Sequence, residues 1–153
     1  MPHRRFKSVS DIIAFAIERE IEAADGYGRM AGLARLPGLS EFLLFLRQEE
    51  ESHRRILEGL TQKELDGLDV ALVPDLRLVD YLVEEKLTDD MTLQELLIFA
   101  AQKEKKAVEL YDTLARMAKV SGHHKLFEFL AGQERTHKLK IEAEYEKSFL
   151  QEN

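Results

Sequence analysis

The most informative stretch of the chain is RQEEESHRRIL, at residues 47–57. Its composition is that of a helix with a charged surface. Glu50 and His53 nevertheless fall on the same helical face as Leu46 and Leu57, and such an apolar face packs against other helices in a bundle. An acid and an imidazole on this face need a chemical explanation, because burying a charge without a partner is costly.

The same pattern occurs a second time, 84 residues further along the chain and without a gap. The matched pairs that matter most are Glu20 with Glu104, Tyr27 with Tyr111, Glu50 with Glu134, and His53 with His137. Two unrelated amphipathic helices would share apolar positions, but not acids, imidazoles and tyrosines. The match therefore indicates an internal repeat that carries a function.

Four long helical patterns are separated by breaks in the apolar periodicity. The first covers about residues 9–34, with Ser8 or Ser10 as its N-cap, and Ser40 is expected to cap the second, which ends near residue 60. The third starts where Thr92 precedes Glu95 as in a capping box and ends near residue 120. The fourth follows a break at SGHH and ends near residue 149.

These patterns predict an all-α protein with a single domain over residues 1–153. Two repeated helical hairpins, at residues 9–60 and 91–149, are expected to form an antiparallel four-helix bundle. The crossover at residues 61–90 contains the amphipathic piece LVDYLVEEKL and is long enough to return the chain to the other end of the bundle. The third helix would then lie parallel to the second.

Composition excludes several classes of function. The net charge of −7 argues against a nucleic-acid partner, which requires a basic face. No apolar run approaches the roughly 18 residues of a membrane span, and no export signal is recognisable, so we expect no membrane partner and a cytoplasmic location. The chain has no cysteine, which rules out disulfides, thiolate metal sites and thiol catalysis.

Metal binding would explain why an acid lies on the apolar face of each of the four helices and an imidazole on two of those faces. Four carboxylates carry four negative charges and two divalent cations would neutralise them, with the imidazoles binding in neutral form. A lone Glu-x-x-His pair is weak evidence, but here two pairs lie on apolar faces, each with an acid 30 residues upstream. The predicted ligands are Glu20, Glu50, His53, Glu104, Glu134 and His137, with Glu20 and Glu104 as possible bridges. Oxygen and imidazole ligands suit iron or manganese.

Other residues on the same helical faces are expected to support the site. Tyr27 and Tyr111 lie two turns after the acids of the first and third helices, where their hydroxyls can donate to ligand carboxylates. Ala23 and Ala107 would leave room for metals or an oxidant. The repeated phenylalanines are expected in the core; they are Phe15, Phe45, Phe99 and Phe129.

The sequence resembles the rubrerythrin-like branch of the ferritin-like superfamily. The matching motifs are EIEAADGY and EKKAVELY on the first and third helices, and EESH and ERTH on the second and fourth. The resemblance covers nearly the whole chain and all six ligand positions. It implies a ferritin-like bundle, a bridged centre of two iron ions, with manganese possible, and often a homodimer.

The chain departs from that family in two respects. Rubrerythrins proper carry a rubredoxin-like domain held by four cysteines, which delivers electrons; this chain lacks cysteine, so its reductant would be an external electron-donor protein. Peroxidase-type members also carry an extra Glu on the third helix, where this chain has Ala107. A straight transfer of peroxidase activity therefore does not follow.

Three hypotheses of function remain open from the sequence. The first is a non-haem di-iron oxidoreductase that reduces H2O2 or O2 at a site of four Glu and two His. The second is a ferroxidase or iron-handling protein with Fe(II) as its substrate. The third is a metal-stabilised interaction module without turnover. A homodimer is expected, and the repeat permits one that exchanges helical hairpins.

Overall fold

The structure is a computed structural model that describes residues 8–66, 88–119 and 121–150. These residues form the helices α1 (Val9–Leu33), α2 (Pro37–Glu58), α3 (Gln62–Asp66), α4 (Leu93–Met117) and α5 (Ser121–Tyr145). The π-helix η3 (Glu146–Leu150) continues from α5. The four long helices follow the apolar periodicity of the sequence, which confirms the predicted all-α class.

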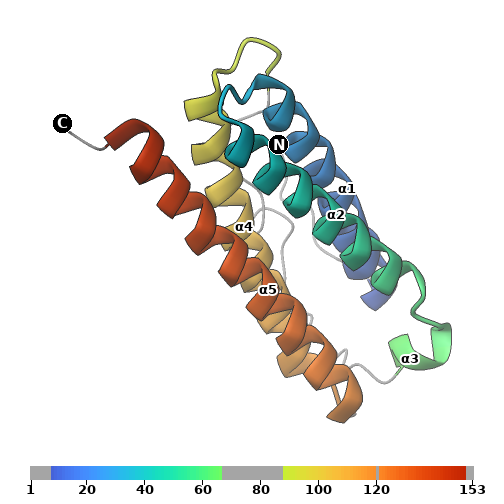
Figure 1. The fold of residues 1–153 in the computed structure, drawn as a ribbon. Helices are drawn as coiled ribbons and strands as arrows, with labels where there is room; N and C mark the ends of the chain where they lie inside the picture. The colour runs from blue at the N-terminus through green and yellow to red at the C-terminus, as the bar shows by residue number, and fades with distance from the viewer. Residues whose placement is uncertain (1–7, 67–87, 120, 151–153) are drawn as a thin grey trace, which may run out of the picture.

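The four long helices form a bundle of two antiparallel hairpins (Figure 1). In Figure 1, α1 and α2 form one hairpin, and α4 and α5 form the other. The short helix α3 lies at one end of the bundle and α4 begins at the other end, so α4 runs parallel to α2 as expected. Most of the predicted crossover, including LVDYLVEEKL, lies outside the described residues.

The hydrophobic core is divided into two clusters, one towards each end of the bundle. One cluster contains Ile12 near the start of α1, Leu57 near the end of α2, Leu114 near the end of α4 and Phe127 near the start of α5. The other joins the opposite ends of the same helices and includes Met30, Leu43, Leu97 and Ile141. The middle of the bundle is left to polar residues, and this division positions the site described below.

Two of the expected helix starts are confirmed by their caps. The side chain of Ser8 accepts a hydrogen bond from the backbone N–H of Asp11 at the start of α1. Thr92 and Glu95 form the complete capping box at the start of α4. In both places a side-chain oxygen satisfies a backbone donor that the helix itself leaves free.

The starts of α2 and α5 differ from the expectations. α2 begins at Pro37, with Leu36 as its N-cap, because a proline fits the first helical position, where its fixed φ and missing N–H are tolerated. Ser40 therefore lies inside the helix, and its hydroxyl donates to the backbone oxygen of Ala31. The SGHH stretch does not separate the helices; it forms the first turn of α5.

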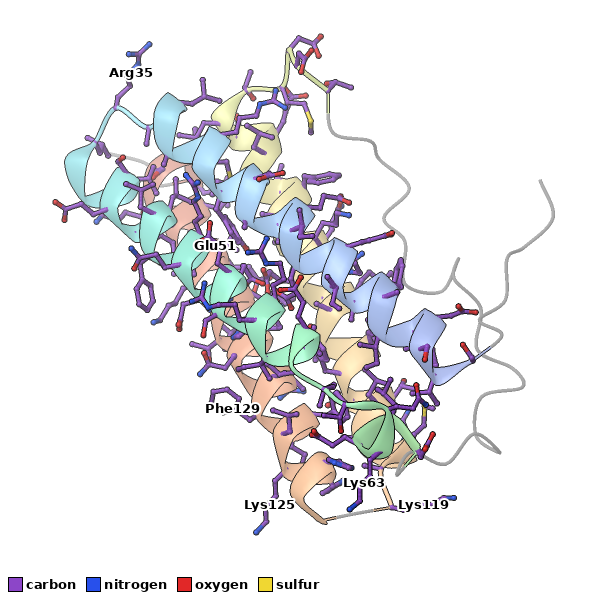
Figure 2. The ribbon with its side chains drawn as sticks, turned by 90° about the vertical axis from the view of Figure 1, so that its right-hand side faces the viewer. Arg35, Glu51, Lys63, Lys119, Lys125 and Phe129 are labelled. Carbon is purple, nitrogen blue, oxygen red and sulfur yellow. The ribbon has the colours of Figure 1, made fainter. Side chains whose placement is uncertain are left out.

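Two of the four repeated phenylalanines lie on the surface, which corrects the prediction that all four are core residues. Phe99 is buried, but Phe45 and Phe129 are 46% and 52% exposed. Figure 2 shows Phe129 on the outer side of α5. Phe45 and Phe129 directly precede the buried residues Leu46 and Leu130, so on a helix their side chains point away from the core.

Among the described residues, none of the helices is both long and apolar enough to span a membrane.

Candidate metal centre

The six predicted ligands are gathered at the middle of the bundle, between the two hydrophobic clusters. α1 and α4 each supply one acid, Glu20 and Glu104, while α2 and α5 each supply a Glu-x-x-His pair. All six residues are at most 2% exposed. Residues three apart lie on neighbouring positions of a helical surface, so each Glu-x-x-His pair points both side chains into the bundle from one turn.

The ligand atoms form two overlapping groups. One group is Glu20, Glu50, His53 and Glu134; the other is Glu50, Glu104, Glu134 and His137. Within each group, one nitrogen or oxygen from every residue lies within 4.8 Å of the others. Each group has the size and the composition of a site for one metal ion, and the two groups share two carboxylates.

The shared carboxylates differ from those that the sequence suggested. Glu50 and Glu134 belong to both groups, whereas Glu20 and Glu104 each belong to one. The acids of α2 and α5 thus lie between the two groups, and the acids of α1 and α4 lie at the two outer sides. The structure thus gives the shared position between the two groups to Glu50 and Glu134, and not to Glu20 and Glu104.

The donor atoms of the cluster fit a pair of cations. Glu20, Glu50 and Glu104 each have one carboxylate oxygen that is buried without a hydrogen-bond partner among the described residues. Orphaned buried oxygens are costly, and a cation would satisfy them. The cluster contains only carboxylate and imidazole donors, which are ligands that iron and manganese accept.

The two imidazoles face the carboxylates through their Nδ1 atoms. His53 Nδ1 lies 2.8 Å from Glu134 Oε1, and His137 Nδ1 lies 2.7 Å from Glu50 Oε1. The rings stack, with centroids 5.9 Å apart and an interplanar angle of 14°. Each histidine thus points its Nδ1 atom at the shared acid of the other hairpin.

The imidazoles of the metal-free cluster differ in charge. Burial lowers the pKa of His53, but the adjacent carboxylates of Glu134, Glu20 and Glu50 outweigh burial and raise it. Burial and the positive charge of His53 lower the pKa of His137 to about 4. Near neutral pH, the His53 ring is therefore a positively charged imidazolium, whereas the His137 ring is a neutral imidazole.

The carboxylates also hold protons in the absence of metal. Burial and the charges of neighbouring acids raise the pKa values of Glu50, Glu104 and Glu134 well above the usual range. Burial acts in the same direction on Glu20, but its contacts with Glu50 and His53 prevail and lower its pKa. The cluster reduces its own repulsion by retaining protons that metal ions would displace.

Two tyrosines connect the ligand acids of the two hairpins. Tyr27 on α1 donates from its hydroxyl to Glu104 Oε1 at 2.6 Å, and Tyr111 on α4 donates to Glu20 Oε1 at 2.5 Å. Both tyrosines are 1% exposed. Burial and the nearby carboxylates raise both tyrosine pKa values well above the usual range, so the hydroxyls stay protonated and hold the carboxylates in place.

A small pocket adjoins the cluster between α1 and α4. It has a volume of about 20 Å³ and is bordered by all four ligand acids and by Ala23 and Ala107, the two small residues expected to leave room there. Arg19 and Lys103 also line it, and the sequence reasoning did not single them out. Their signal was present, because each basic residue directly precedes a ligand Glu at corresponding repeat positions.

Comparison with known proteins supports one family. The family model for rubrerythrin matches residues 11–145. A crystal structure of a protein from Thermotoga maritima, described as a ferritin-like diiron-carboxylate protein, is 27% identical with a TM-score of 0.72, over 95% of this chain and 99% of that one. A hypothetical protein from Pyrococcus furiosus is 25% identical with a TM-score of 0.68, over 92% and 89% of the two chains. None of the curated proteins matches.

Proposed function

The chain belongs to the rubrerythrin family and has the ferritin-like fold of diiron-carboxylate proteins, and from this premise we propose that it is a non-haem di-iron oxidoreductase that reduces H2O2 or O2. One observation carries the proposal: the buried Glu and His residues form two adjoining groups that share Glu50 and Glu134. The donor types suit manganese as well as iron. The similarity to a protein described as diiron-carboxylate favours iron.

Each of the six residues has a distinct part in this proposal. Glu50 and Glu134 would bridge the two ions. His53 and Glu20 would complete one coordination sphere, and His137 and Glu104 the other. Four carboxylates and two neutral imidazoles neutralise two divalent ions, so a loaded site would be stable inside an apolar bundle.

The reaction needs two electrons and two protons for each H2O2 that becomes two waters. Two bound iron ions would supply the two electrons on oxidation from the ferrous to the ferric state. The protein holds the carboxylates through Tyr27 and Tyr111, and the pocket between α1 and α4 limits access to small molecules. An external electron-donor protein would restore the reduced state, because the chain has no cysteine to hold a rubredoxin-type iron.

The decisive experiment is anaerobic loading with Fe(II), followed by rapid mixing with H2O2 or with O2 while near-ultraviolet absorbance is recorded. We expect two irons per chain and fast oxidation by one of the two oxidants. Turnover of many Fe(II) per chain would instead indicate iron handling. A fully loaded site that reacts with neither oxidant would overturn the redox proposal and leave a structural metal.

The ligand assignment is tested by replacing one bridging acid. Glu50→Ala removes a ligand common to both groups, so we expect the protein to lose the uptake of two irons. Glu51→Ala is the matched control, because Glu51, labelled in Figure 2, is the next residue on α2 and forms an exposed ion pair with Arg47. Iron content after gel filtration distinguishes the variants. Two irons retained by Glu50→Ala would refute the assignment.

The oligomeric state is part of the same proposal. Rubrerythrin-like proteins suggest a homodimer, and the exposed Phe45 and Phe129 offer apolar contacts on α2 and α5. Exchange of helical hairpins between two chains would keep the ligand set complete, because each hairpin supplies three of the six ligands. Light scattering coupled to gel filtration measures the mass directly.

A further inference from the structure

The residue just before each Glu-x-x-His pair differs between the two halves of the metal centre. The repeat matches each predicted ligand of the first hairpin with the same residue type in the second. The preceding residue does not follow this rule, because it is Glu49 on α2 and Gln133 on α5. Glu49 is partly exposed and belongs to neither group of candidate ligands. A carboxylate at this position therefore calls for an explanation other than direct metal binding.

Glu49 lies on the outer side of the His137 ring. Nδ1 of His137 points into the cluster and lies 2.7 Å from Glu50 Oε1. Nε2 lies on the other side of the ring, 4.0 Å from Glu49 Oε1. This separation is an ion-pair distance and is longer than a direct hydrogen bond. The Glu49 side chain is 31% exposed, so a small rotation or one bridging water completes the contact.

Metal binding at Nδ1 would determine which proton Glu49 meets. A neutral imidazole carries a single proton, and the nitrogen that binds a metal is the one without it. The proton of a metal-bound His137 would therefore lie on Nε2, which faces Glu49. A carboxylate that accepts a hydrogen bond from this N–H fixes the orientation of the ring and makes the imidazole a stronger ligand.

The corresponding position beside His53 offers a weaker acceptor. The contacts of His53 with three cluster acids use Nδ1, the atom that faces the cluster; these acids are Glu20, Glu50 and Glu134. Gln133 occupies the repeat position of Glu49. An amide oxygen accepts a hydrogen bond without the charge that strengthens such a bond to a carboxylate. The repeat therefore gives the two histidines outer residues of unequal strength.

A cation near His137 does not replace this contact. Lys140 lies three residues after His137 on α5, and its positive charge contributes to the lowered pKa of that imidazole. Its Nζ lies 5.9 Å from the ring centroid of Phe45 on α2. The ammonium group can offset part of the longer-range field of Glu49, but it has no lone pair to accept a proton from Nε2. The role of hydrogen-bond acceptor is left to the carboxylate.

We propose that Glu49 is a positioning residue that accepts the Nε2–H of metal-bound His137 and makes the metal position of His137 and Glu104 the tighter of the two. The inference rests on the proposed function, because it requires two bound ions, but it requires no oxidant. It assigns an order of loading to a site whose six ligands match in pairs. The first ion binds at His137 and Glu104, and the second at His53 and Glu20.

The test is a stepwise titration of the metal-free protein with Fe(II) in the absence of oxygen, in competition with a chelator. Glu49→Gln keeps the shape of the side chain, removes its charge and gives both histidines the same outer residue. We expect the dissociation constant of the tighter step to rise about tenfold, the lower end of the effect of outer residues on metal affinity. The weaker step should stay within about twofold. The reverse change, Gln133→Glu, should tighten the weaker step by a similar factor.

Sequential loading with two iron isotopes gives a spectroscopic readout of the order. One equivalent of Mössbauer-active iron is added first, followed by one equivalent of a silent isotope. The label should occupy one iron environment in the wild type and be divided between two in Glu49→Gln. A substitution that only disturbs the fold does not redistribute the label. A label that is already divided equally in the wild type would contradict the assigned order.

Two control variants separate the contact from a general effect of charge. Glu51→Gln removes the same charge on the other side of Glu50, from a side chain in an exposed ion pair, so both steps should stay within about twofold. The exchange Glu49→Gln/Gln133→Glu keeps the net charge and should restore the gap between the steps that Glu49→Gln narrows. Equal weakening of both steps in Glu49→Gln, no change in either, or an unchanged weaker step in Gln133→Glu would overturn the inference.

The outcomes separate this inference from the proposed function. A wild-type protein that does not take up two irons contradicts the proposed function itself. A wild-type protein that loads two irons and consumes an oxidant, while Glu49→Gln binds both irons equally well, contradicts only the role of Glu49. Circular dichroism of each metal-free variant establishes that the comparison is made on folded protein.

Discussion

Tyr27 and Tyr111 are single residues that connect the two halves of the site. Each hydroxyl donates to the ligand acid of the other hairpin, across the α1–α4 contact. The hydrogen bonds fix one oxygen of Glu104 and one of Glu20, and so direct the second oxygen of each acid towards the cluster. Mutation of such outer residues typically costs about 10- to 100-fold in metal affinity or activity.

Removing either hydroxyl is therefore expected to weaken metal binding. Tyr27→Phe or Tyr111→Phe should lower the affinity for Fe(II) by about 10- to 100-fold, measured by competition with a chelator. Tyr145→Phe is the control, because its hydroxyl accepts a hydrogen bond from Gln94 at a distance from the ligand cluster. An affinity that is unchanged in both site variants would mean that these tyrosines only fill space.

The structure brings together the six residues that the sequence singled out, but their division into two overlapping groups could not be predicted. Acids and imidazoles on apolar helical faces are rare enough that two matching sets at one offset identify them. Which acids are shared depends on how the helices are offset across the bundle, and sequence spacing within each helix does not contain that information. The surface position of Phe45 and Phe129 was missed for a similar reason: an apolar residue beside the apolar stripe can face either way.

At the scale of the elements, the helix ends show which local signals are decisive. The spacing of Thr92 and Glu95 predicted the start of α4, because both backbone donors at that end need the two side chains. Ser40 was a misleading signal at the start of α2. Pro37 begins that helix four residues before the start that a Ser40 N-cap would give, and the Ser40 hydroxyl instead donates to the Ala31 carbonyl oxygen of α1.

The capping box at α4 should contribute measurably to stability. Thr92→Ala leaves the N–H of Glu95 without its side-chain acceptor, so we expect the free energy of unfolding to fall by about 1 kcal/mol. Thr136→Ala makes the same chemical change in the exposed middle of α5, where the hydroxyl donates to the Gly132 carbonyl oxygen. Urea unfolding of the metal-free proteins compares them, and an equal effect of the two substitutions would show that the cap is not responsible.

At the scale of the whole molecule, the repeat predicted more than the helices alone. An ungapped offset of 84 residues implies two equivalent hairpins, and a long connector between them implies that the second hairpin begins at the end of the bundle opposite to the one where the first began and ended. The structure has this arrangement, with α4 parallel to α2 (Figure 1). How closely the hairpins approach each other could not be predicted, because it depends on small side chains such as Ala23 and Ala107 and on buried charges such as Arg19.

The buried charges also determine how the metal-free bundle responds to pH. Glu50, Glu104 and Glu134 have raised pKa values in the folded state, so the folded protein retains protons that the unfolded chain releases above about pH 4.5. His53 acts in the same direction above about pH 6.5. His137, with a pKa of about 4, opposes this trend only below about pH 6.5, and Glu20 only below about pH 4.5. Above pH 6.5 the shifts of the cluster therefore all favour unfolding as pH rises.

We expect the melting temperature of the metal-free protein to fall between pH 6.5 and 8.5, because each retained proton removes about 1.4 kcal/mol of stability per pH unit. The metal-loaded protein should not show this fall, since metal binding displaces the protons and its ligands are already ionised. Calorimetry of both forms in matched buffers makes the comparison.

Two further measurements test the same retained protons. Loading the metal-free protein with metal at pH 7.5 should release protons into a dilute indicator solution. The Glu50→Gln substitution should reduce the pH dependence of the melting temperature of the metal-free form. A metal-free protein that becomes more stable over this range would show that its buried carboxyls are ionised, with their charges balanced in another way.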